Sequence, residues 1–384
     1  HQEDLEDTAV KVCRLLKDIV ERQLVSDVPV CTLLSGGLDS SALTAFAADA
    51  FKREGMGPIY TYSIDYSDNE SHFQANHFQP DSDSLWVDFV SGFLGTCHHK
   101  IVVDIPELAE ALTEAVRAKD LPGMADIDSS LYLFCREIKK EATVALSGEA
   151  ADEIFGGYPW FHDEDVLREG TFPWIRSLNK RLSLLSPELI KYIRPEEYME
   201  ARYRETLAEV PRLPGEDPLE ARRREMFYLN MMWFMTTLLD RKDRMSMAHG
   251  LEVRVPFCDH RLVEYIWNVP WKIKMCDNQV KGILRRALVG ILPTEILSRR
   301  KSPYPKTHHP EYMSAVKKSL LEILRDYNSP LLPLIDADAV LSMIDSKKIV
   351  FSRPWFGQLM ADAQYFAYLI QVDAWLREYR VIIS

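Results

Sequence analysis

The residues with the clearest chemical purpose lie between Val28 and Ser41, where an apolar run ends in the sequence Ser-Gly-Gly-Leu-Asp-Ser. Glycines let the backbone approach a ligand closely, so that successive amide N–H groups can point at one anion. A helix that begins near Ser40 would add its positive end and the free N–H groups of its first turn. The stretch therefore predicts a cradle for phosphate groups, and pyrophosphate fits it well.

An aspartate, Asp39, stands where the common nucleoside-triphosphate loop carries a lysine ahead of its helix. A carboxylate beside bound phosphates is repulsive unless a cation lies between them, so Asp39 predicts a magnesium ion with oxygen ligands. The sequence from Ser35 to Ser40 is similar to the PP-loop of the ATP pyrophosphatases. These enzymes cleave ATP between its α and β phosphates and activate a substrate as its adenylate. The alternative is a glycine-rich turn that binds no ligand.

A second acid-bearing sequence follows an apolar strand at residues 147–158, Ser-Gly-Glu-Ala-Ala-Asp-Glu-Ile-Phe-Gly-Gly-Tyr. In a parallel sheet the carboxyl ends of strands face one pocket near the point where the strand order reverses. Asp152 could then share the magnesium ion with Asp39, and Glu149 could accept a proton from an incoming amine. Alternatively, Asp152 and Glu153 are ordinary acids of a helix N-terminus.

The two sequences together resemble the synthetase domain of the glutamine-dependent asparagine synthetases. Further similarity lies in residues 241–259, Arg-Lys-Asp-Arg-Met-Ser-Met-Ala-His-Gly-Leu-Glu-Val-Arg-Val-Pro-Phe-Cys-Asp, and in residues 281–286, Lys-Gly-Ile-Leu-Arg-Arg. The resemblance extends over about residues 6 to 380. It implies a ligase that forms β-aspartyl-AMP from aspartate and ATP with release of pyrophosphate, after which ammonia displaces AMP to give asparagine.

The resemblance also implies roles for individual residues. The ATP and pyrophosphate site would consist of Leu34, Ser35, Gly36, Gly37, Leu38, Asp39, Ser40, Ile64, Ser147 and Gly148. The catalytic residues would be Glu149, Asp152 and Lys281, and Mg²⁺ would be held by Asp39 and Asp152. A fixed ammonium at Lys281 would stabilise charge on phosphate oxygens. The alternative for Lys281 is a solvated lysine in a basic helix.

Binding of the amino acid is assigned to Asp126, Asp128, Ser129 and Arg244. The first three lie in residues 121–130, where the family reads its amino-acid substrate with a different, arginine-containing sequence. Arg244 has an alternative, which is an ion pair with Asp243 or Glu252. The basic loop from Lys301 to Lys306 could close over a phosphate, although an ordinary surface turn fits it slightly better.

Ala150 stands where the family usually has glycine. Alanine is strained if the backbone there needs a positive φ. A helix that begins at Glu149 would remove the difficulty, because alanine suits a helix well.

Strand and helix patterns alternate over the first 160 residues, which predicts an α/β fold, a doubly wound parallel sheet with helices on both faces. The predicted strands are Val28–Leu34, Ile59–Ile64, Lys100–Val103 and Thr143–Leu146. The predicted helices are Glu6–Gln23, Ser40–Glu54, Ser84–Leu94, Pro106–Lys119 and Ser129–Lys140. We expect residues 1–160 to form the nucleotide-binding core and residues 161–384 a mostly helical part that completes one merged catalytic domain. Residues 218–247 read as one long helix.

Charge, cysteine content and apolar runs indicate which partners the protein binds and in which compartment it lies. The 384 residues carry a net charge of −12, which argues against a nucleic-acid partner. The six cysteines form no Cys-x-x-Cys pair, and no apolar run reaches the length of a membrane span, so we expect a cytoplasmic protein that binds no membrane. The expected partners are the small molecules aspartate, ATP and ammonia.

No residue here fits the cysteine nucleophile of the glutaminase domain that begins full-length members of the family. We expect that such a domain has been removed from this chain, which would otherwise use free ammonia. The sequence leaves open whether the protein forms a homodimer. It also leaves open two other functions, a β-lactam-type or other amide synthetase that acts on a different carboxylate, and a nucleotide-binding module without catalysis.

Overall fold

A parallel sheet organises the chain, for which the computed structural model describes residues 1–75, 79, 81–175, 178–346, 351, 355 and 360–383. Within these residues the sheet has five strands in the order β3-β2-β1-β4-β5. The strands are β1 Val30–Leu33, β2 Tyr60–Tyr66, β3 Cys97–Val103, β4 Val144–Leu146 and β5 Glu252–Arg254. The order reverses between β1 and β4, so the loops after these two strands meet at the switch point of the sheet.

The four predicted strands are confirmed, and the sheet contains a fifth that the sequence did not predict. β5 pairs with β4 in parallel, with Glu252 opposite Val144 and Arg254 opposite Leu146. Three residues with two charged side chains give no apolar run, which is why the pattern of β5 was not visible. Because β5 lies beyond residue 160, the later part of the chain contributes to the sheet, and the division at residue 160 stays a prediction.

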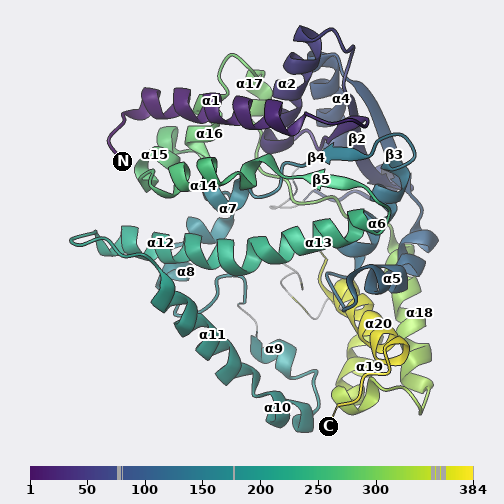
Figure 1. The fold of residues 1–384 in the computed structure, drawn as a ribbon. Coiled ribbons are helices and arrows are strands. Elements are labelled where there is room, and N and C mark those ends of the chain that lie inside the picture. The colour runs from purple at the N-terminus through teal and green to yellow at the C-terminus, as the bar shows by residue number, and fades with distance from the viewer. Residues whose placement is uncertain are drawn as a thin grey trace.

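Helices cover both faces of the sheet, as predicted (Figure 1). The helices of the first part are α1 Leu5–Gln23, α2 Leu38–Arg53, α3 Asn69–His72, α4 Asp83–Leu94, α5 Ile105–Lys119, α6 Asp126–Ile138 and α7 Ala151–Phe155. One apolar cluster joins α1 and α2 to Val144 and Leu146, while another joins α5 and α6 to Ala145. Alternate residues of β4 therefore face opposite layers, as a strand buried on both sides requires.

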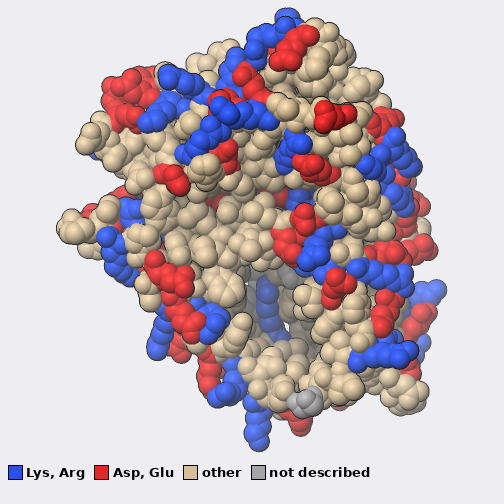
Figure 2. All heavy atoms as spheres, viewed as in Figure 1, with Lys and Arg blue, Asp and Glu red and all other residues tan. Residues whose placement is uncertain are grey.

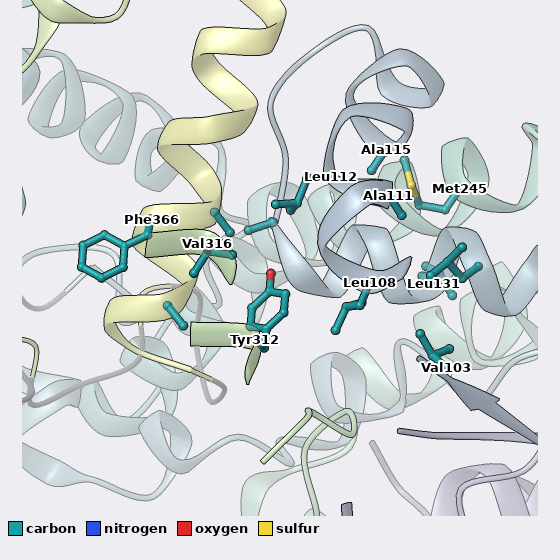
Figure 3. Packing of buried hydrophobic residues seen from close by; sticks show 14 of the residues in the cluster. Val103, Leu108, Ala111, Leu112, Ala115, Leu131, Met245, Tyr312, Val316 and Phe366 are labelled. Atoms are coloured by element: carbon teal, nitrogen blue, oxygen red, sulfur yellow. The ribbon is translucent and has the colours of Figure 1, made fainter. Parts of the chain in front are cut away.

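The rest of the chain is mostly helical. Its helices are α8 Glu164–Arg168, α9 Leu178–Leu182, α10 Pro187–Ile193, α11 Pro195–Glu209, α12 Pro218–Leu229, α13 Thr236–Met247, α14 His260–Trp267, α15 Trp271–Lys274, α16 Gly282–Ala287, α17 Thr294–Ser298, α18 Pro310–Arg325, α19 Ala337–Asp345 and α20 Asp362–Glu378. Short 3₁₀ turns occur at Pro159–Phe161, Pro256–Cys258, Cys276–Asn278 and Leu332–Leu334. Figure 3 shows how α18 and α20 pack through Tyr312, Val316 and Phe366 beside Leu108 and Leu112 of α5.

The predicted single helix over residues 218–247 is interrupted. A π-helical segment, Asn230–Met235, separates α12 from α13, and the side chain of Asn230 donates a hydrogen bond back to the carbonyl of Met226 in α12. A π turn adds one residue to the helical repeat and rotates the following side chains by about 100° relative to an uninterrupted helix. This rotation determines which residues of α13 face the interior.

Acidic and basic side chains are mixed over the face of the molecule that Figure 2 shows, without a continuous basic stripe. Among the described residues, no helix combines the length and the apolar character that crossing a bilayer would demand.

Candidate active site

A cavity of about 300 Å³ lies at the carboxyl ends of the central strands. The loops after β1 and β4, the end of β2, one side of α13 and the chain between Val280 and Pro305 line it. Among the predicted ATP-site residues, the cavity is lined by Leu34, Ser35, Gly37, Leu38, Asp39, Ser40, Ile64, Ser147 and Gly148. The structure thus brings together segments that are up to about 270 residues apart in the sequence.

The loop after β1 folds tightly. Gly36 has a φ of +68°, and a Cβ atom there would lie 2.6 Å from the Cβ of Trp86, so only glycine fits. The Ser35 amide donates to the Ser40 hydroxyl at 3.1 Å, and Gly37 is the N-cap of α2. Since α2 has 16 residues, its positive end faces the cavity with a full macrodipole behind it. The loop has the geometry expected of an anion cradle.

Arg299 supports this loop from the other side, and sequence reasoning missed it. Its guanidinium donates to the Ser35 carbonyl at 3.2 Å and to Asp83 at 2.5 Å, and it lies over the Trp86 ring. The residue is 5% exposed. The loop is therefore anchored by a buried cation that comes from a distant part of the chain.

The loop after β4 packs directly against the first. A Cβ atom on Gly148 would lie 2.9 Å from the Ser40 amide nitrogen, so the two backbones touch. The expected helical start at Glu149 is wrong, because α7 begins at Ala151 and Ala150 has a left-handed φ of +71°. Ala150 thus occupies the conformation that favours glycine.

Two carboxylates and two lysines meet where these loops touch. Asp39, Asp152, Lys281 and Lys301 are called the loop cluster below. Lys281 is 4% exposed, and its Nζ lies 2.6 Å from Asp39 Oδ2 and 2.5 Å from Asp152 Oδ1. Lys301 pairs with the other oxygen of Asp152. The alternative of a solvated Lys281 is therefore wrong, and so is the ordinary surface turn expected for Lys301.

The electrostatics of the loop cluster follow from burial and pairing. Burial lowers the pKa of a lysine, but Asp152 and Asp39 outweigh it and raise the pKa of Lys281. Burial would likewise raise the pKa of Asp152, yet Lys281 and Lys301 together hold this pKa below its usual range. Asp39 has a raised pKa, because burial and the neighbouring Asp152 outweigh its single partner Lys281. Asp39 is therefore the carboxylate with the weakest compensation.

Glu149 also lines the cavity, in a group that the sequence did not predict. Arg241 Nη2 is 2.7 Å and Lys242 Nζ is 3.4 Å from Glu149 Oε1, while Glu149 Oε2 is buried without a hydrogen-bond partner among the described residues. Arg241 and Lys242 are 4% and 5% exposed. We call Glu149, Arg241 and Lys242 the helix cluster, since both cations belong to α13.

The residues that we assigned to the amino acid lie elsewhere. Arg244 is half-exposed, pairs with Asp240 on the same helix and lies outside the cavity lining, so the structure does not bring it together with the other predicted site residues. The helix α6 begins at Asp126, three residues earlier than predicted, and this start buries Asp126, Asp128 and Ser129 behind the wall. Asp128 accepts a hydrogen bond from the Met124 amide, and Ser129 donates to the Ala125 carbonyl. From residues 121–130 it is Met124 and Ile127 that line the cavity.

A buried pair, Glu153 and Tyr158, also lines the cavity. The Tyr158 hydroxyl donates to Glu153 Oε1 at 2.7 Å. Burial and the neighbouring Asp152 raise the pKa of Glu153 to about 7. Lys301 lies 4.5 Å from the centre of the Tyr158 ring. Glu153 is therefore not an ordinary exposed acid of a helix N-terminus.

A parallel sheet with two glycine-containing loops, and with carboxylates and lysines paired at its switch point, defines an α/β protein with a candidate ligand site at the carboxyl ends of its strands. Comparison with known proteins narrows this class. The family model described as Asparagine synthase matches residues 11–377. The chain belongs to the asparagine synthase family.

Individual relatives agree with this family. The chain is 56% identical over 384 residues to glutamine-hydrolyzing asparagine synthetase 3 of Bacillus subtilis. It is 26% identical to the glutamine-hydrolyzing asparagine synthetases of Mus musculus, over 332 residues, and of Homo sapiens, over 321 residues. These matches cover 100%, 84% and 82% of this chain. They cover 62%, 47% and 45% of the relatives, so the chain spans about half to three fifths of their length.

Proposed function

We propose that this chain is the synthetase part of an asparagine-forming ligase. In the first step, the side-chain carboxylate of aspartate attacks the α-phosphorus of ATP, which forms β-aspartyl-AMP and releases pyrophosphate. In the second step, ammonia attacks the acyl carbon and displaces AMP to give asparagine. The observation that carries this proposal is the loop cluster, buried where the loops after β1 and β4 touch. Membership of the asparagine synthase family supports the choice of reaction.

The loop from Ser35 to Ser40 binds the phosphates of ATP in this proposal. Its support is the positive end of α2 and the backbone geometry at Gly36. Leu34 and Ile64 supply apolar surface for the adenosine part, since both line the same cavity. Glu149 lines the same cavity, and in this proposal the carboxylate substrate and ammonia bind beside it.

Two half-buried carboxylates at this position, Asp39 and Asp152, fit a magnesium ion. Asp39 Oδ1 is buried without a hydrogen-bond partner among the described residues, and hard oxygen ligands are those that Mg²⁺ prefers. No group of three His, Cys, Asp or Glu side chains suited to a metal occurs in the described part of the chain, so phosphate and water would supply the other ligands. Asp39 and Asp152 would hold the ion, and when bound it neutralises phosphate charge.

Lys281 and Lys301 neutralise charge that develops on pyrophosphate as it leaves. Lys281 is buried, and both lysines are held beside Asp152, so little reorganisation is needed when phosphate oxygens arrive. Lys301 was not among the catalytic residues assigned from the sequence. We add it here because the loop that carries it lines the cavity.

Glu149 accepts a proton from the attacking ammonia. Its Oε1 is fixed by Arg241 and Lys242, which leaves Oε2 free to take the proton. The same two cations offer charge partners to an amino-acid carboxylate. Aspartate as the substrate, and ammonia derived from glutamine by a part outside this chain, are proposals that rest on what the relatives are named. All six cysteines are unpaired, which supports the cytoplasmic location that we propose.

The test measures pyrophosphate release with ATP, ammonia and a panel of carboxylic amino acids. We expect release with aspartate, and its loss in Asp39→Asn. We expect Glu149→Gln to lose the formation of asparagine, because Glu149 acts on ammonia in the second step. Asp49→Asn is the matched control, since Asp49 lies on the same helix as Asp39 but is exposed and pairs with Lys17. Release with a larger carboxylate alone would favour a different amide synthetase on this scaffold. ATP binding without release for any acid would favour a module without catalysis.

A further inference from the structure

A second cavity, of about 260 Å³, lies away from the candidate active site and shares no lining residue with it. Its walls come from α12, α14 and α15, which lie on the left side of Figure 1, together with the chain before α12 and His1. Three aromatic residues line it, Phe227, Trp267 and Trp271. The established family and the proposed reaction assign nothing to this cavity.

Lys274 is a charged side chain in this cavity without a polar partner. It is 3% exposed, and among the described residues it makes no hydrogen bond and no ion pair. Its Nζ lies 3.9 Å from the centre of the Phe227 ring, which is a cation–π contact. A buried lysine almost always has a partner, because the cost of removing its charge from water is otherwise unmet.

The acids around Lys274 are all engaged with other groups. Arg224 binds Glu216 at 2.6 Å, and Arg223 binds Glu220 at 2.8 Å. Asp217 accepts hydrogen bonds from the first amides of α12, and the other oxygen of Glu220 accepts from the Trp271 amide. His1, at the edge, contacts Thr8 and Glu3. Lys274 is thus the one unpaired charged side chain among the cavity's lining residues, all of which the structure describes.

Burial, reinforced by repulsion from Arg224, lowers the pKa of Lys274 to about 7, while Glu220 acts in the opposite direction. The neutral and the charged lysine are therefore close in free energy near neutral pH, and an anion that enters the cavity would favour the charged form.

We propose that this cavity is a second binding site, which takes a small aromatic carboxylate with Lys274 as its charge partner. A single carboxylate matches the single unpaired ammonium, and the flat apolar body matches the walls formed by Phe227, Trp267 and Trp271. A polyanion such as phosphate fits less well, since Glu216, Asp217 and Glu220 stand close by.

Binding to this site takes up a proton. Burial lowers the pKa of Lys274, so part of the lysine population is neutral near neutral pH and becomes charged when a carboxylate binds. Because the carboxylate binds the ammonium form of Lys274, its affinity for the cavity is highest below pH 7. Above pH 7 this affinity falls by about tenfold per pH unit.

Isothermal titration calorimetry with benzoate tests the proposal, in two buffers that differ in ionisation enthalpy. We expect wild type to bind benzoate with proton uptake, to bind neutral benzamide far more weakly, and to bind inorganic phosphate more weakly than benzoate. Lys274→Met should weaken benzoate binding by about tenfold or more, since a charge-assisted hydrogen bond is lost. Lys272→Met is the matched control on the same helix, because Lys272 is exposed, and it should bind as wild type does.

A second variant keeps the test decisive if Lys274→Met folds poorly. Lys274→Arg keeps the charge permanently, so it should bind benzoate without proton uptake and without the loss of affinity above pH 7. The proposal would be overturned if wild type did not bind benzoate, or if Lys274→Met bound it as tightly as wild type does. It would also be overturned if proton uptake persisted in Lys274→Arg, or if benzamide or phosphate bound as tightly as benzoate. None of these results depends on the proposed synthetase activity.

Discussion

The loop cluster and the helix cluster lie in one cavity and both bury ions, but they compensate charge differently. In the loop cluster, Lys281 is shared by two carboxylates, and Asp39 has no other ion-pair partner among the described residues. In the helix cluster, one carboxylate, Glu149, is shared by two cations. Loss of one cation should therefore be far more harmful in the loop cluster, because it leaves a buried carboxylate without compensation.

Replacement of Lys281 should have the largest effect. In Lys281→Met, Asp39 and Asp152 would remain buried near each other with Lys301 as the remaining lysine of the cluster. Breaking a buried ion pair by removing one partner costs about 3–5 kcal/mol of unfolding free energy. We also expect pyrophosphate release to fall by about a thousandfold or more, since a fixed charge at the leaving group is lost.

Chemical denaturation and the pyrophosphate assay measure these two effects. Lys272→Met, which removes an exposed lysine, should change neither by much. If Lys281→Met were as stable as wild type, Asp39 would have to be protonated or otherwise paired in the free protein. The comparison between the two clusters would then fail.

Replacement of Arg241 should have a smaller effect. Arg241→Met leaves Glu149 beside Lys242, at 3.4 Å, so the carboxylate keeps a partner. We expect pyrophosphate release to fall by about 10- to 100-fold, and unfolding free energy to fall by about 1–3 kcal/mol, in proportion to one lost charge-assisted hydrogen bond.

The control for Arg241 is Arg244→Met, one turn further along α13. Arg244 is half-exposed and pairs with Asp240, so its loss should leave activity near that of wild type. A loss of activity in Arg244→Met as large as in Arg241→Met would restore the original assignment of Arg244 to the amino acid. A loss in Arg241→Met as large as in Lys281→Met would show that the clusters do not differ.

The two clusters also differ in how far the sequence predicted them. Asp39, Asp152 and Lys281 stand in short segments whose glycines and strand ends determine their position within a few residues. Such local geometry is visible in the order of residue types. The sheet, its helices and the carboxylates of the loop cluster could therefore be predicted, whereas β5 was too short and too charged to be detected.

Arg241 and Lys242 could not be predicted because their direction depends on the π-helical segment Asn230–Met235. A regular helix from residue 218 places the side chains of α13 about 100° away from their observed direction. Nothing in the apolar pattern marks the position where the extra residue is accommodated. The same kind of error affected Asp126 and Asp128, because an earlier start of α6 puts them into its first turn and buries them.

Replacement of Ala150 should have the smallest effect. Its strained backbone lies in the loop that contributes Glu149 to the helix cluster and Asp152 to the loop cluster. In Ala150→Gly, relief of the left-handed conformation at φ +71° returns about 1–2 kcal/mol. The flexibility of glycine costs about 0.5–1 kcal/mol, and the lost buried methyl group costs about 0.8 kcal/mol. We therefore expect the unfolding free energy to change by less than about 1 kcal/mol, from the balance of these terms.

Ala151→Gly is the matched variant, because Ala151 is equally buried but lies in the helical region of α7. It gains no relief of strain, so it should lose about 1.5 kcal/mol in the same denaturation experiment. Pyrophosphate release in Ala150→Gly should stay close to that of wild type, since the loop already has the conformation that glycine favours. Equal losses of stability in the two variants would mean that Ala150 is not strained in solution, and that the loop of the second acidic sequence adopts another conformation there.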